Sequence, residues 1–481
     1  MAGSPGSSTI RTAASFDGEG MGFTQDLTRF VKRTGFQDLP PEVVHEAKRV
    51  LLDSIGCAIA GITSDKGKIA IQMARSMGGP EESSILGIGH KGAAGNVAFA
   101  NGELTNALDY DAISHIPPFV IPPALALAER RGASGKELIV ATVLAQETGK
   151  RISLALSSMI SHLTERAEAP AVHGNGQECI FGGTLGAAKV LGLDEEKMAN
   201  ALGLAGAYCP VPSARKWSDT SPMSMVKYAP AGWLCLGSVT VSLLAGMGYT
   251  GDTTIFDGDY GFFRFYGSDR WDPGLVLERL GEQWRFLDIQ YKPYPCCRFL
   301  HSQLDCFISI IEKNDLRPEE IESVRYWSFP YFTASPPKEV ANQIDAQFCE
   351  TYAVAVAAHR VRIGSEWLDR ATVHDPRIRE FMKKVVVGVH PEAVEAKRKE
   401  WRRYLSKVEV KARGQTFVEE RMYAKGTSFT DARMTDGELL EKFKANAFKI
   451  LTEDKIDRAA AMLFDLERVG DVRDLMRELT L

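Results

Sequence analysis

The first segment that could carry chemistry lies between Leu108 and Pro118 and places two carboxylates near an imidazole. Asp109, Asp111 and His115 follow one predicted helix and precede another, in a connection that ends with two prolines. Acids and bases held between rigid helices are well placed to transfer protons. The same carboxylates could instead cap helix ends or pair with nearby cations, and this segment alone does not decide between the two interpretations.

Two further segments each contribute one ionisable side chain. His173 precedes Gly-Asn-Gly and a predicted helix, so a ligand could approach it closely and an anion could meet the helix N-terminus. A surface or capping histidine would give the same pattern. Lys227 lies among apolar residues just before a long apolar helix. Its ammonium group could neutralise a substrate carboxylate, or it could extend along the apolar surface to reach solvent.

The fourth segment combines two cations with two aromatic hydroxyls. Lys292 and Arg298 are flanked by Tyr291 and Tyr294, and two prolines stiffen the run. Such a group suits carboxylate recognition, with Arg298 able to bind a carboxylate through two parallel hydrogen bonds. An ordinary linker between domains would explain the segment equally well. The adjacent pair Cys296-Cys297 has no neighbouring base pattern, so we interpret both thiols as packing residues.

Other chemical motifs are weak or missing from the sequence. The run from Gly87 to Gly92 fits GxGxxG, and Asp109 stands at about the distance of a ribose-binding acid. However, that acid follows a predicted helix where a dinucleotide-binding fold needs a second strand, which disfavours an NAD-dependent oxidoreductase. The 9 histidines are dispersed and the 8 cysteines form no CxxC pair, so we predict no metal site and reduced thiols.

The elements that must position these segments are mainly helices. Apolar residues recur at helical spacing after Pro40-Pro41-Glu42, and several later segments repeat this pattern. We predict a helical domain over residues 23–286, preceded by a disordered tail over residues 1–22. Its later helices are predicted at Ala93–Leu108, Val120–Arg130, Gly135–Leu156, Gln177–Leu191, Asp194–Tyr208 and Ala229–Gly248, with a short strand at Ser84–Leu86.

The pattern changes near Trp284. Apolar and polar residues alternate over Glu322–Phe332 and Lys407–Val418, which predicts strands, whereas Asn342–His359 and Asp375–Val386 have helical spacing. Helices return at Asp436–Ile450, Glu453–Phe464 and Val472–Leu479. The predicted fold class is therefore mainly α: a large all-helical domain plus a smaller α+β lid domain over residues 287–431. The lid is inserted before the C-terminal helices, at residues 432–481, which we expect to pack on the first domain.

Composition excludes several classes of function. The 57 basic and 62 acidic residues give a formal charge of -5, which gives no support to binding of nucleic acid. No apolar run is long enough to cross a membrane. The segment from Met1 to Gly20 lacks the apolar stretch of a signal peptide and is a poor mitochondrial transit peptide. We therefore expect a cytoplasmic protein, with a mitochondrial location as the less favoured alternative.

Taken together, these segments resemble the MmgE/PrpD family, which includes 2-methylcitrate dehydratases, cis-aconitate decarboxylases and iminodisuccinate epimerases. The resemblance extends from about Phe23 to Leu479 and rests on six loose motifs that occur in the family's order. The matching segments are Asn101–Asp111, His173 with Gly183–Leu193, Lys227–Gly248, Phe256–Phe262, Lys292–Cys296, and Asp345–Phe348 with Tyr352–Ala355.

The resemblance implies a pocket between the helical domain and the lid. The catalytic residues that it implies are Asp109, His115, His173, Lys227, Lys292 and Tyr352. The two lysines would hold substrate carboxylates, a histidine or the tyrosine would move a proton at carbon, and the aspartate would orient its histidine neighbour. Arg298 is a further candidate for substrate binding. The family also implies chemistry without a cofactor, a small anionic carboxylate as substrate, and a homodimer.

The leading functional hypothesis is a lyase that dehydrates a hydroxy acid resembling 2-methylcitrate. Decarboxylation of a cis-aconitate-type acid and epimerisation of an iminodiacid are alternatives that use the same groups, and a non-catalytic ligand-binding homologue is more remote. The sequence departs from the family pattern around the expected pocket. Ala112 replaces the second aspartate of a pair, the turn before His115 is short, and Pro230 replaces a histidine. These changes leave the identity of the acid open.

Overall fold

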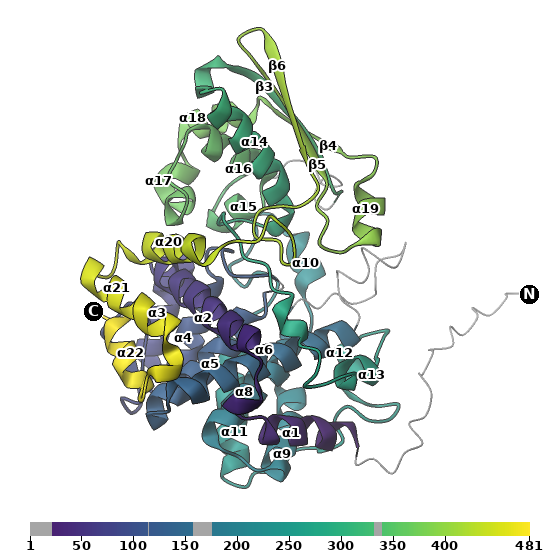
Figure 1. Cartoon of the computed structure of the whole chain (residues 1–481), viewed down its shortest axis with the longest axis vertical. Helices are drawn as coiled ribbons and strands as arrows, with labels where there is room; N and C mark the ends of the chain where they lie inside the picture. The colour runs from purple at the N-terminus through teal and green to yellow at the C-terminus, as the bar shows by residue number, and fades with distance from the viewer. Residues whose placement is uncertain (1–21, 114, 157–175, 331–338) are drawn as a thin grey trace, which may run out of the picture.

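The computed structural model describes residues 22–113, 115–156, 176–330 and 339–481. Figure 1 shows a large helical body and, at one end of it, a smaller unit built around a sheet. No helix in the described ranges is both long enough and apolar enough to cross a bilayer. The arrangement agrees with the predicted mainly α class with a smaller α+β part.

The helical body contains most of the predicted helices within a few residues of their expected bounds. Its helices are α1 (Phe23–Arg33), α2 (Pro41–Gly61), α3 (Asp65–Met77), α4 (Ala94–Asn106), α5 (Pro117–Arg131), α6 (Gly135–Ala155), α8 (Ile180–Leu191), α9 (Glu195–Tyr208), α10 (Ala214–Ser218), α11 (Ala231–Gly246), α12 (Phe262–Tyr266) and α13 (Pro273–Leu277). Helix α2 begins at Pro41, whose fixed φ suits a first helical turn. The glycine-rich run that fits GxGxxG forms part of the turn after β1 (Ser83–Ser84) and the whole of β2 (Lys91–Gly92), two short antiparallel strands.

Close packing in the body depends on small residues where helices meet. An added Cβ at Gly182 of α8 would lie 2.5 Å from the carbonyl oxygen of Ala145 in α6. An added Cβ at Gly102 of α4 would lie 2.6 Å from the sulfur of Cys235 in α11. Both distances are too short for a real side chain, so these glycines let the helices around the site approach closely.

The smaller unit contains a four-stranded sheet in the order β4-β3-β5-β6. Its strands are β3 (Ile321–Ser328), β4 (Val385–Val389), β5 (Ser406–Ala412) and β6 (Gln415–Arg421), with β3 parallel to β4 and antiparallel to β5. The helices of this unit are α14 (His301–Lys313), α15 (Gln343–Gln347), α16 (Glu350–Ala358), α17 (Arg370–Val373), α18 (Pro376–Met382) and α19 (Ala393–Lys399).

The structure corrects three predictions in this unit. The helix predicted to run to Val386 ends at Met382, because the following run of β-branched valines forms strand β4 beside β3. The run predicted as one strand after Lys407 is a hairpin, with Arg413 and Gly414 at positive φ in its turn. The helix predicted from Asn342 is divided in two, where the carbonyl of Gln347 accepts a hydrogen bond from the Cys297 N–H at 2.9 Å.

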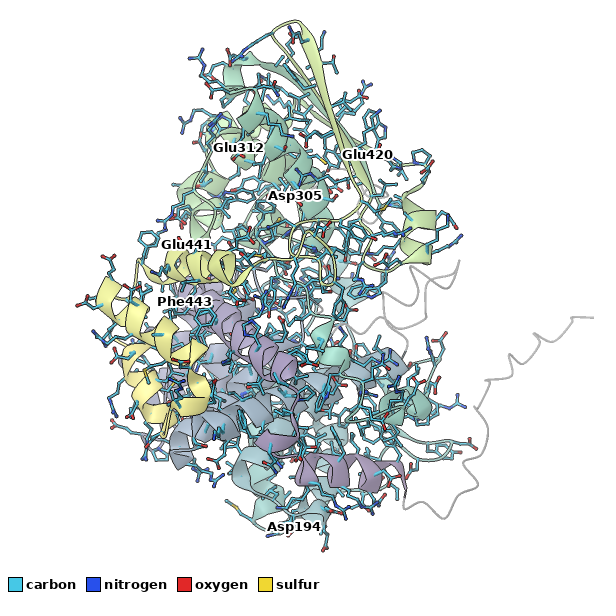
Figure 2. All side chains as sticks on the ribbon, in the orientation of Figure 1. Asp194, Asp305, Glu312, Glu420, Glu441 and Phe443 are labelled. Atoms are coloured by element: carbon cyan, nitrogen blue, oxygen red, sulfur yellow. The ribbon has the colours of Figure 1, made fainter. Side chains whose placement is uncertain are left out.

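The last three helices, α20 (Asp436–Ala447), α21 (Glu453–Phe464) and α22 (Val472–Glu478), return to the helical body, as Figure 1 shows. Helices α20 and α21 pack against α2, and α22 packs against α5. Figure 2 labels Phe443 on α20, and an added Cβ at Gly56 of α2 would lie 3.1 Å from the Phe443 ring. The chain therefore leaves the body, builds the sheet unit and comes back.

Each unit has its own apolar core. The core of the smaller unit also takes in Leu108 and Tyr110, which belong to the body. These two residues flank Asp109, so the segment expected to carry chemistry lies where the two cores meet.

Candidate functional site

The site is built on a tight turn that follows helix α4. Three of its residues, Asp109 (φ 52°), His115 (φ 63°) and Lys227 (φ 58°), have the left-handed backbone conformation that non-glycine residues seldom adopt. The turn after α4, which carries Asp109 and His115, and the segment before α11, which carries Lys227, therefore present side chains in directions that a regular helix would not allow. Strained backbone of this kind concentrates at functional sites.

Two lysines converge on the Asp109 carboxylate. The Nζ of Lys227 lies 2.7 Å from Oδ1, and the Nζ of Lys292 lies 2.6 Å from Oδ2. All three side chains are fully buried. Lys227 also donates to the carbonyl of Asn106 at 2.8 Å, and Lys292 also donates to the carbonyl of Asp109 at 2.6 Å. Because an ammonium group has three N–H donors, each lysine keeps one donor for a ligand.

Burial and charge act against each other in this cluster. Burial would raise the pKa of Asp109, but Lys227 and Lys292 overcome it and hold that pKa well below its usual value. Burial also lowers the pKa of Lys227 to about 8, although Asp109 opposes this. For Lys292, the carboxylates of Asp109 and Asp111 outweigh burial and raise the pKa. Lys292 therefore stays protonated at neutral pH, whereas Lys227 can release a proton near neutral pH.

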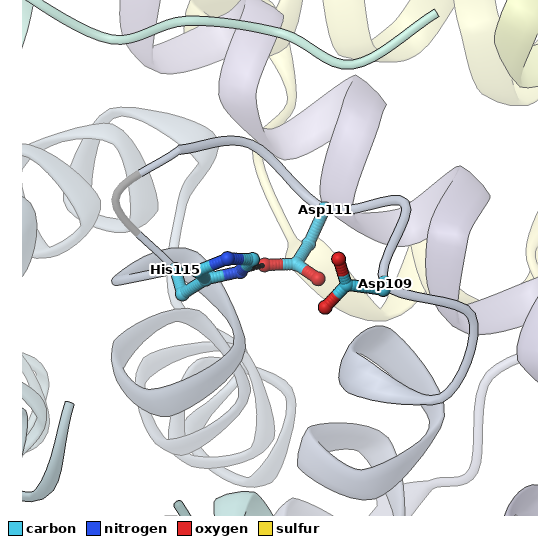
Figure 3. Close-up of side chains that lie close together, drawn as sticks. All are labelled: Asp109, Asp111 and His115. Carbon is cyan, nitrogen blue, oxygen red and sulfur yellow. Dashed lines mark hydrogen bonds and ion pairs between the residues drawn. The ribbon is translucent and has the colours of Figure 1, made fainter. Parts of the chain in front are cut away.

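His115 stands beside this cluster on the same turn. Its Nδ1 lies 2.8 Å from Oδ2 of Asp111 and 2.7 Å from the hydroxyl of Tyr228. Figure 3 shows the Asp111 carboxylate between the His115 ring and the Asp109 carboxylate. Burial would raise the pKa of Asp111, but His115 outweighs it and lowers that pKa, so Asp111 is ionised. Within the described ranges, His115 Nε2 has no hydrogen-bond partner and can meet a ligand.

The ligand atoms of Asp109, Asp111 and His115 lie within 4.8 Å of one another, a spacing that could hold a metal ion. However, both Asp109 oxygens already accept hydrogen bonds from ammonium groups. Two adjacent ammonium groups repel a divalent cation, and their charges balance the carboxylates of Asp109 and Asp111. The arrangement therefore disfavours a metal ion, and the remaining N–H donors of the lysines suit an anionic ligand.

A second buried ion pair supports the turn from the C-terminal side of the chain. Lys442 of α20 lies 2.6 Å from Asp53 of α2 and donates to the carbonyl of Tyr110 at 2.8 Å. Tyr110 lies between the two site aspartates, so this bond fixes the backbone that carries both. The Lys442 Nζ also lies 3.9 Å from the centre of the Tyr110 ring.

The structure brings four predicted residues together: Asp109, His115, Lys227 and Lys292. His173 falls outside the described residues. Tyr352 lies in α16, where its hydroxyl donates to the carbonyl of Trp367, and no described contact joins it to the Asp109 cluster.

Arg298 has a different environment from the one that the sequence suggested. Its guanidinium group donates to the carbonyl of Lys425 at 2.6 Å, to the hydroxyl of Thr427 at 2.8 Å and to the side chain of Gln290 at 3.1 Å. These bonds connect the start of the smaller unit to the segment through which the chain leaves it. They use both terminal nitrogens, so Arg298 holds the chain together at this point, and its contact with a substrate stays a prediction.

Sequence reasoning missed Tyr228, Asn106 and the pair Asp53–Lys442. Tyr228 directly follows a lysine that the sequence did suggest, but a single tyrosine has no spacing that marks it. Asn106 ends α4 inside a motif that was used only for the resemblance. Asp53 and Lys442 are separated by almost the whole chain, so only the packing of α20 on α2 reveals their contact.

Comparison with known proteins places this geometry in a family. The MmgE/PrpD N-terminal domain matches residues 25–273, and the MmgE/PrpD C-terminal domain matches residues 294–467. A protein of Aspergillus terreus named cis-aconitate decarboxylase is 25% identical over 368 residues, which cover 70% of this chain and 71% of that protein. A Homo sapiens protein of the same name is 23% identical over 459 residues, which cover 90% and 89% of the two chains. The two family domains span most of the sequence, and the chain therefore belongs to the MmgE/PrpD family.

Proposed function

We propose that the chain is a lyase that acts on a small polycarboxylate, and that its reaction is a decarboxylation of the cis-aconitate type. The names of the relatives favour this reaction over the dehydration of a 2-methylcitrate-like acid, which was our leading hypothesis from the sequence. The observation that carries the proposal is the convergence of Lys227 and Lys292 on one buried aspartate, each with an N–H donor to spare.

Decarboxylation of an unsaturated tricarboxylate requires charge recognition and one proton. When the carbon–carbon bond to a carboxylate breaks, its electron pair forms a new double bond. The electrons of the original double bond then move to the neighbouring carbon, which takes up a proton as carbon dioxide leaves. Lys292 keeps its charge and would hold one of the remaining carboxylates.

The proton would come from Lys227 or His115. Lys227 has a pKa of about 8 because it is buried, so its proton is available near neutral pH. His115 is only 12% exposed, and its Nε2 has no hydrogen-bond partner within the described ranges. Asp109 would not touch the substrate, and its part would be to position both ammonium groups.

The test is to incubate the purified protein with cis-aconitate and with 2-methylcitrate in deuterated water and to follow both by NMR. Decarboxylation predicts carbon dioxide release from cis-aconitate and one deuterium at a product carbon. Loss of water from 2-methylcitrate without carbon dioxide release would replace our proposal with the dehydratase hypothesis. If neither acid changed, the substrate class proposed would be wrong.

Replacement of Lys292 tests the site itself. We expect Lys292→Ala to lower kcat/KM on the order of 100-fold or more, because both the substrate carboxylate and Asp109 lose the ammonium group that stays protonated. Lys397→Met is the matched control, since Lys397 is also buried but lies in α19 over the ring of Tyr404. The control should change kcat/KM by less than about twofold. Full activity of Lys292→Ala would contradict the site.

A further inference from the structure

A chain of buried polar side chains lies behind His115. Lys66 of α3 donates to Oδ1 of Asn106 at 2.8 Å and forms an ion pair with Glu103 at 2.9 Å. The Asn106 amide nitrogen donates to the hydroxyl of Tyr228 at 2.8 Å, and this hydroxyl lies 2.7 Å from His115 Nδ1. An amide does not pass protons along readily, so this chain serves to orient groups and does not conduct protons.

The direction of each hydrogen bond in this row of side chains follows from its first residue, Lys66. An ammonium group can only donate, so the Asn106 oxygen must face Lys66 and the Asn106 NH₂ must face Tyr228. The Tyr228 oxygen then accepts from Asn106 and has one proton of its own to donate. Two acceptors are within reach: Oδ1 of Asp109 at 3.4 Å and, if it lacks a proton, Nδ1 of His115.

Asp111 decides where the Tyr228 proton goes. An ionised carboxylate can only accept, so its 2.8 Å contact with His115 Nδ1 requires a proton on that nitrogen. Nδ1–H then faces two acceptors, the Asp111 carboxylate and the Tyr228 oxygen, and the Tyr228 proton turns toward Asp109. In the neutral ring this leaves the lone pair on Nε2, the nitrogen without a described partner.

We infer that Tyr228 is a positioning residue that, with Asp111, holds His115 as the Nδ1–H tautomer so that Nε2 acts on the substrate. The inference rests on the proposed function only in giving His115 a part in proton transfer: Nε2 takes up a proton from solvent and then gives it to the substrate carbon. One hydrogen bond to Asp111 leaves an imidazole free to swing, whereas two acceptors on either side of Nδ1–H fix its plane. The rings of His115 and Tyr228, with centroids 4.5 Å apart, add to that restraint.

The first measurement needs no substrate. Full-length protein labelled with ¹⁵N only at histidine is sedimented and studied by magic-angle-spinning NMR, and His115→Asn identifies the His115 signals. We expect a protonated Nδ1 and an unprotonated Nε2 in the wild-type protein. In Tyr228→Phe we expect the His115 signals to split or broaden. A protonated Nε2 in the wild-type protein, or unchanged signals in Tyr228→Phe, would overturn the inference whatever the substrate is.

Kinetics provide the second measurement. Tyr228→Phe should lower kcat by about 10- to 100-fold with KM changed by less than about twofold, because ring position and not substrate binding is lost. Tyr326→Phe is the matched control, since Tyr326 is a fully buried tyrosine of strand β3. It should retain wild-type kcat. Equal losses in both variants would show a general packing effect and would contradict the inference.

Asn106→Asp tests the direction of the chain. Aspartate keeps the bond to Lys66 but cannot donate to Tyr228, so the Tyr228 proton should turn toward residue 106 and away from Asp109. The Tyr228 oxygen can still accept from Nδ1–H in this variant, so we expect the His115 ¹⁵N signals to keep the wild-type pattern, in contrast to Tyr228→Phe. Signals that split or broaden as in Tyr228→Phe would contradict this direction of the bonds.

Discussion

At the scale of single residues, the site depends on backbone conformations that oppose the ordinary preferences of the chain. Asp109, His115 and Lys227 all have positive φ, at a cost of about 1–3 kcal/mol each. Their side chains form the bonds that hold them there, since Asp109 receives both lysines and His115 meets Asp111 and Tyr228. The strain is thus tied to the groups that the proposed reaction needs.

The pKa of Lys227 predicts a limit on activity at alkaline pH. Burial lowers this pKa to about 8, so the ammonium group loses its proton above that value and can neither hold a carboxylate nor donate a proton. We expect kcat/KM to fall about tenfold per pH unit above about pH 8. Lys227→Arg, whose charge persists at high pH, should abolish that limb of the profile even if its activity is low.

The free energy of unfolding should rise, while activity falls, as the pH increases above about 8. The unfolded chain keeps the Lys227 proton up to about pH 10.4, whereas the native protein loses it near pH 8. The unfolded state therefore binds more protons between these values, and the contribution of Lys227 to the free energy of unfolding rises with pH. A loss of activity that coincides with unfolding, followed by circular dichroism, would contradict the assignment to Lys227.

At the scale of elements, helix α20 supports the turn that carries the two aspartates. Lys442 bonds both Asp53 of α2 and the carbonyl of Tyr110. Lys442→Met would leave Asp53 as a buried charge without its cation, and breaking such a pair costs about 3–5 kcal/mol. We expect a loss of that size in the free energy of unfolding, measured with urea, and a lower kcat because the turn loosens.

A double variant separates the effect of the Asp53–Lys442 ion pair from the effect of the Lys442 hydrogen bond to Tyr110. Asp53→Asn with Lys442→Met removes both charges, so most of the lost stability should return. The bond to Tyr110 is still missing in this variant, so kcat should stay low. If the double variant regained full activity, α20 would contribute only stability and would not position the turn.

At the scale of the whole molecule, helix α11 and the residue after it present a mainly apolar stripe that is partly exposed to solvent. Trp233 is 51% exposed and Met247 is 81% exposed, and Leu236, Thr240 and Leu243 stand between them at helical spacing. The family resemblance implies a homodimer, and we predict that this stripe is its interface. A dimer would sediment at twice the chain mass of 52.8 kDa.

Analytical ultracentrifugation tests that interface. Trp233→Glu places a charge at one end of the stripe, on its large exposed aromatic residue, and should shift the protein from dimer to monomer. Tyr260→Glu is the control, because Tyr260 is 92% exposed but lies outside the stripe. The proposed interface would be wrong if Trp233→Glu remained a dimer, or if both variants dissociated equally.

Much of the fold follows from local patterns. Helices such as α6, α9 and α21 begin and end close to their predicted bounds, because their apolar spacing and first residues fix them without help from distant parts of the chain. Strand β4 was predicted as the end of a helix, since short apolar runs suit a helix or a strand until a neighbour pairs with them. The strands after Lys407 were predicted, but the turn that separates β5 from β6 was missed. The bonds of Arg298 to the carbonyls of Ala424 and Lys425 could not be predicted, because these residues lie far along the sequence.

The sequence by itself determined the segments that carry Asp109, His115, Lys227 and Lys292, and their order identified a family resemblance. It did so because these groups lie on connections between helices whose spacing is a local property. Only the tertiary structure decided that both lysines share one carboxylate, that Tyr228 and Asn106 orient His115, and that Lys442 supports the turn. These contacts join residues up to hundreds of positions apart, and only the packing of distant helices brings them within bonding distance.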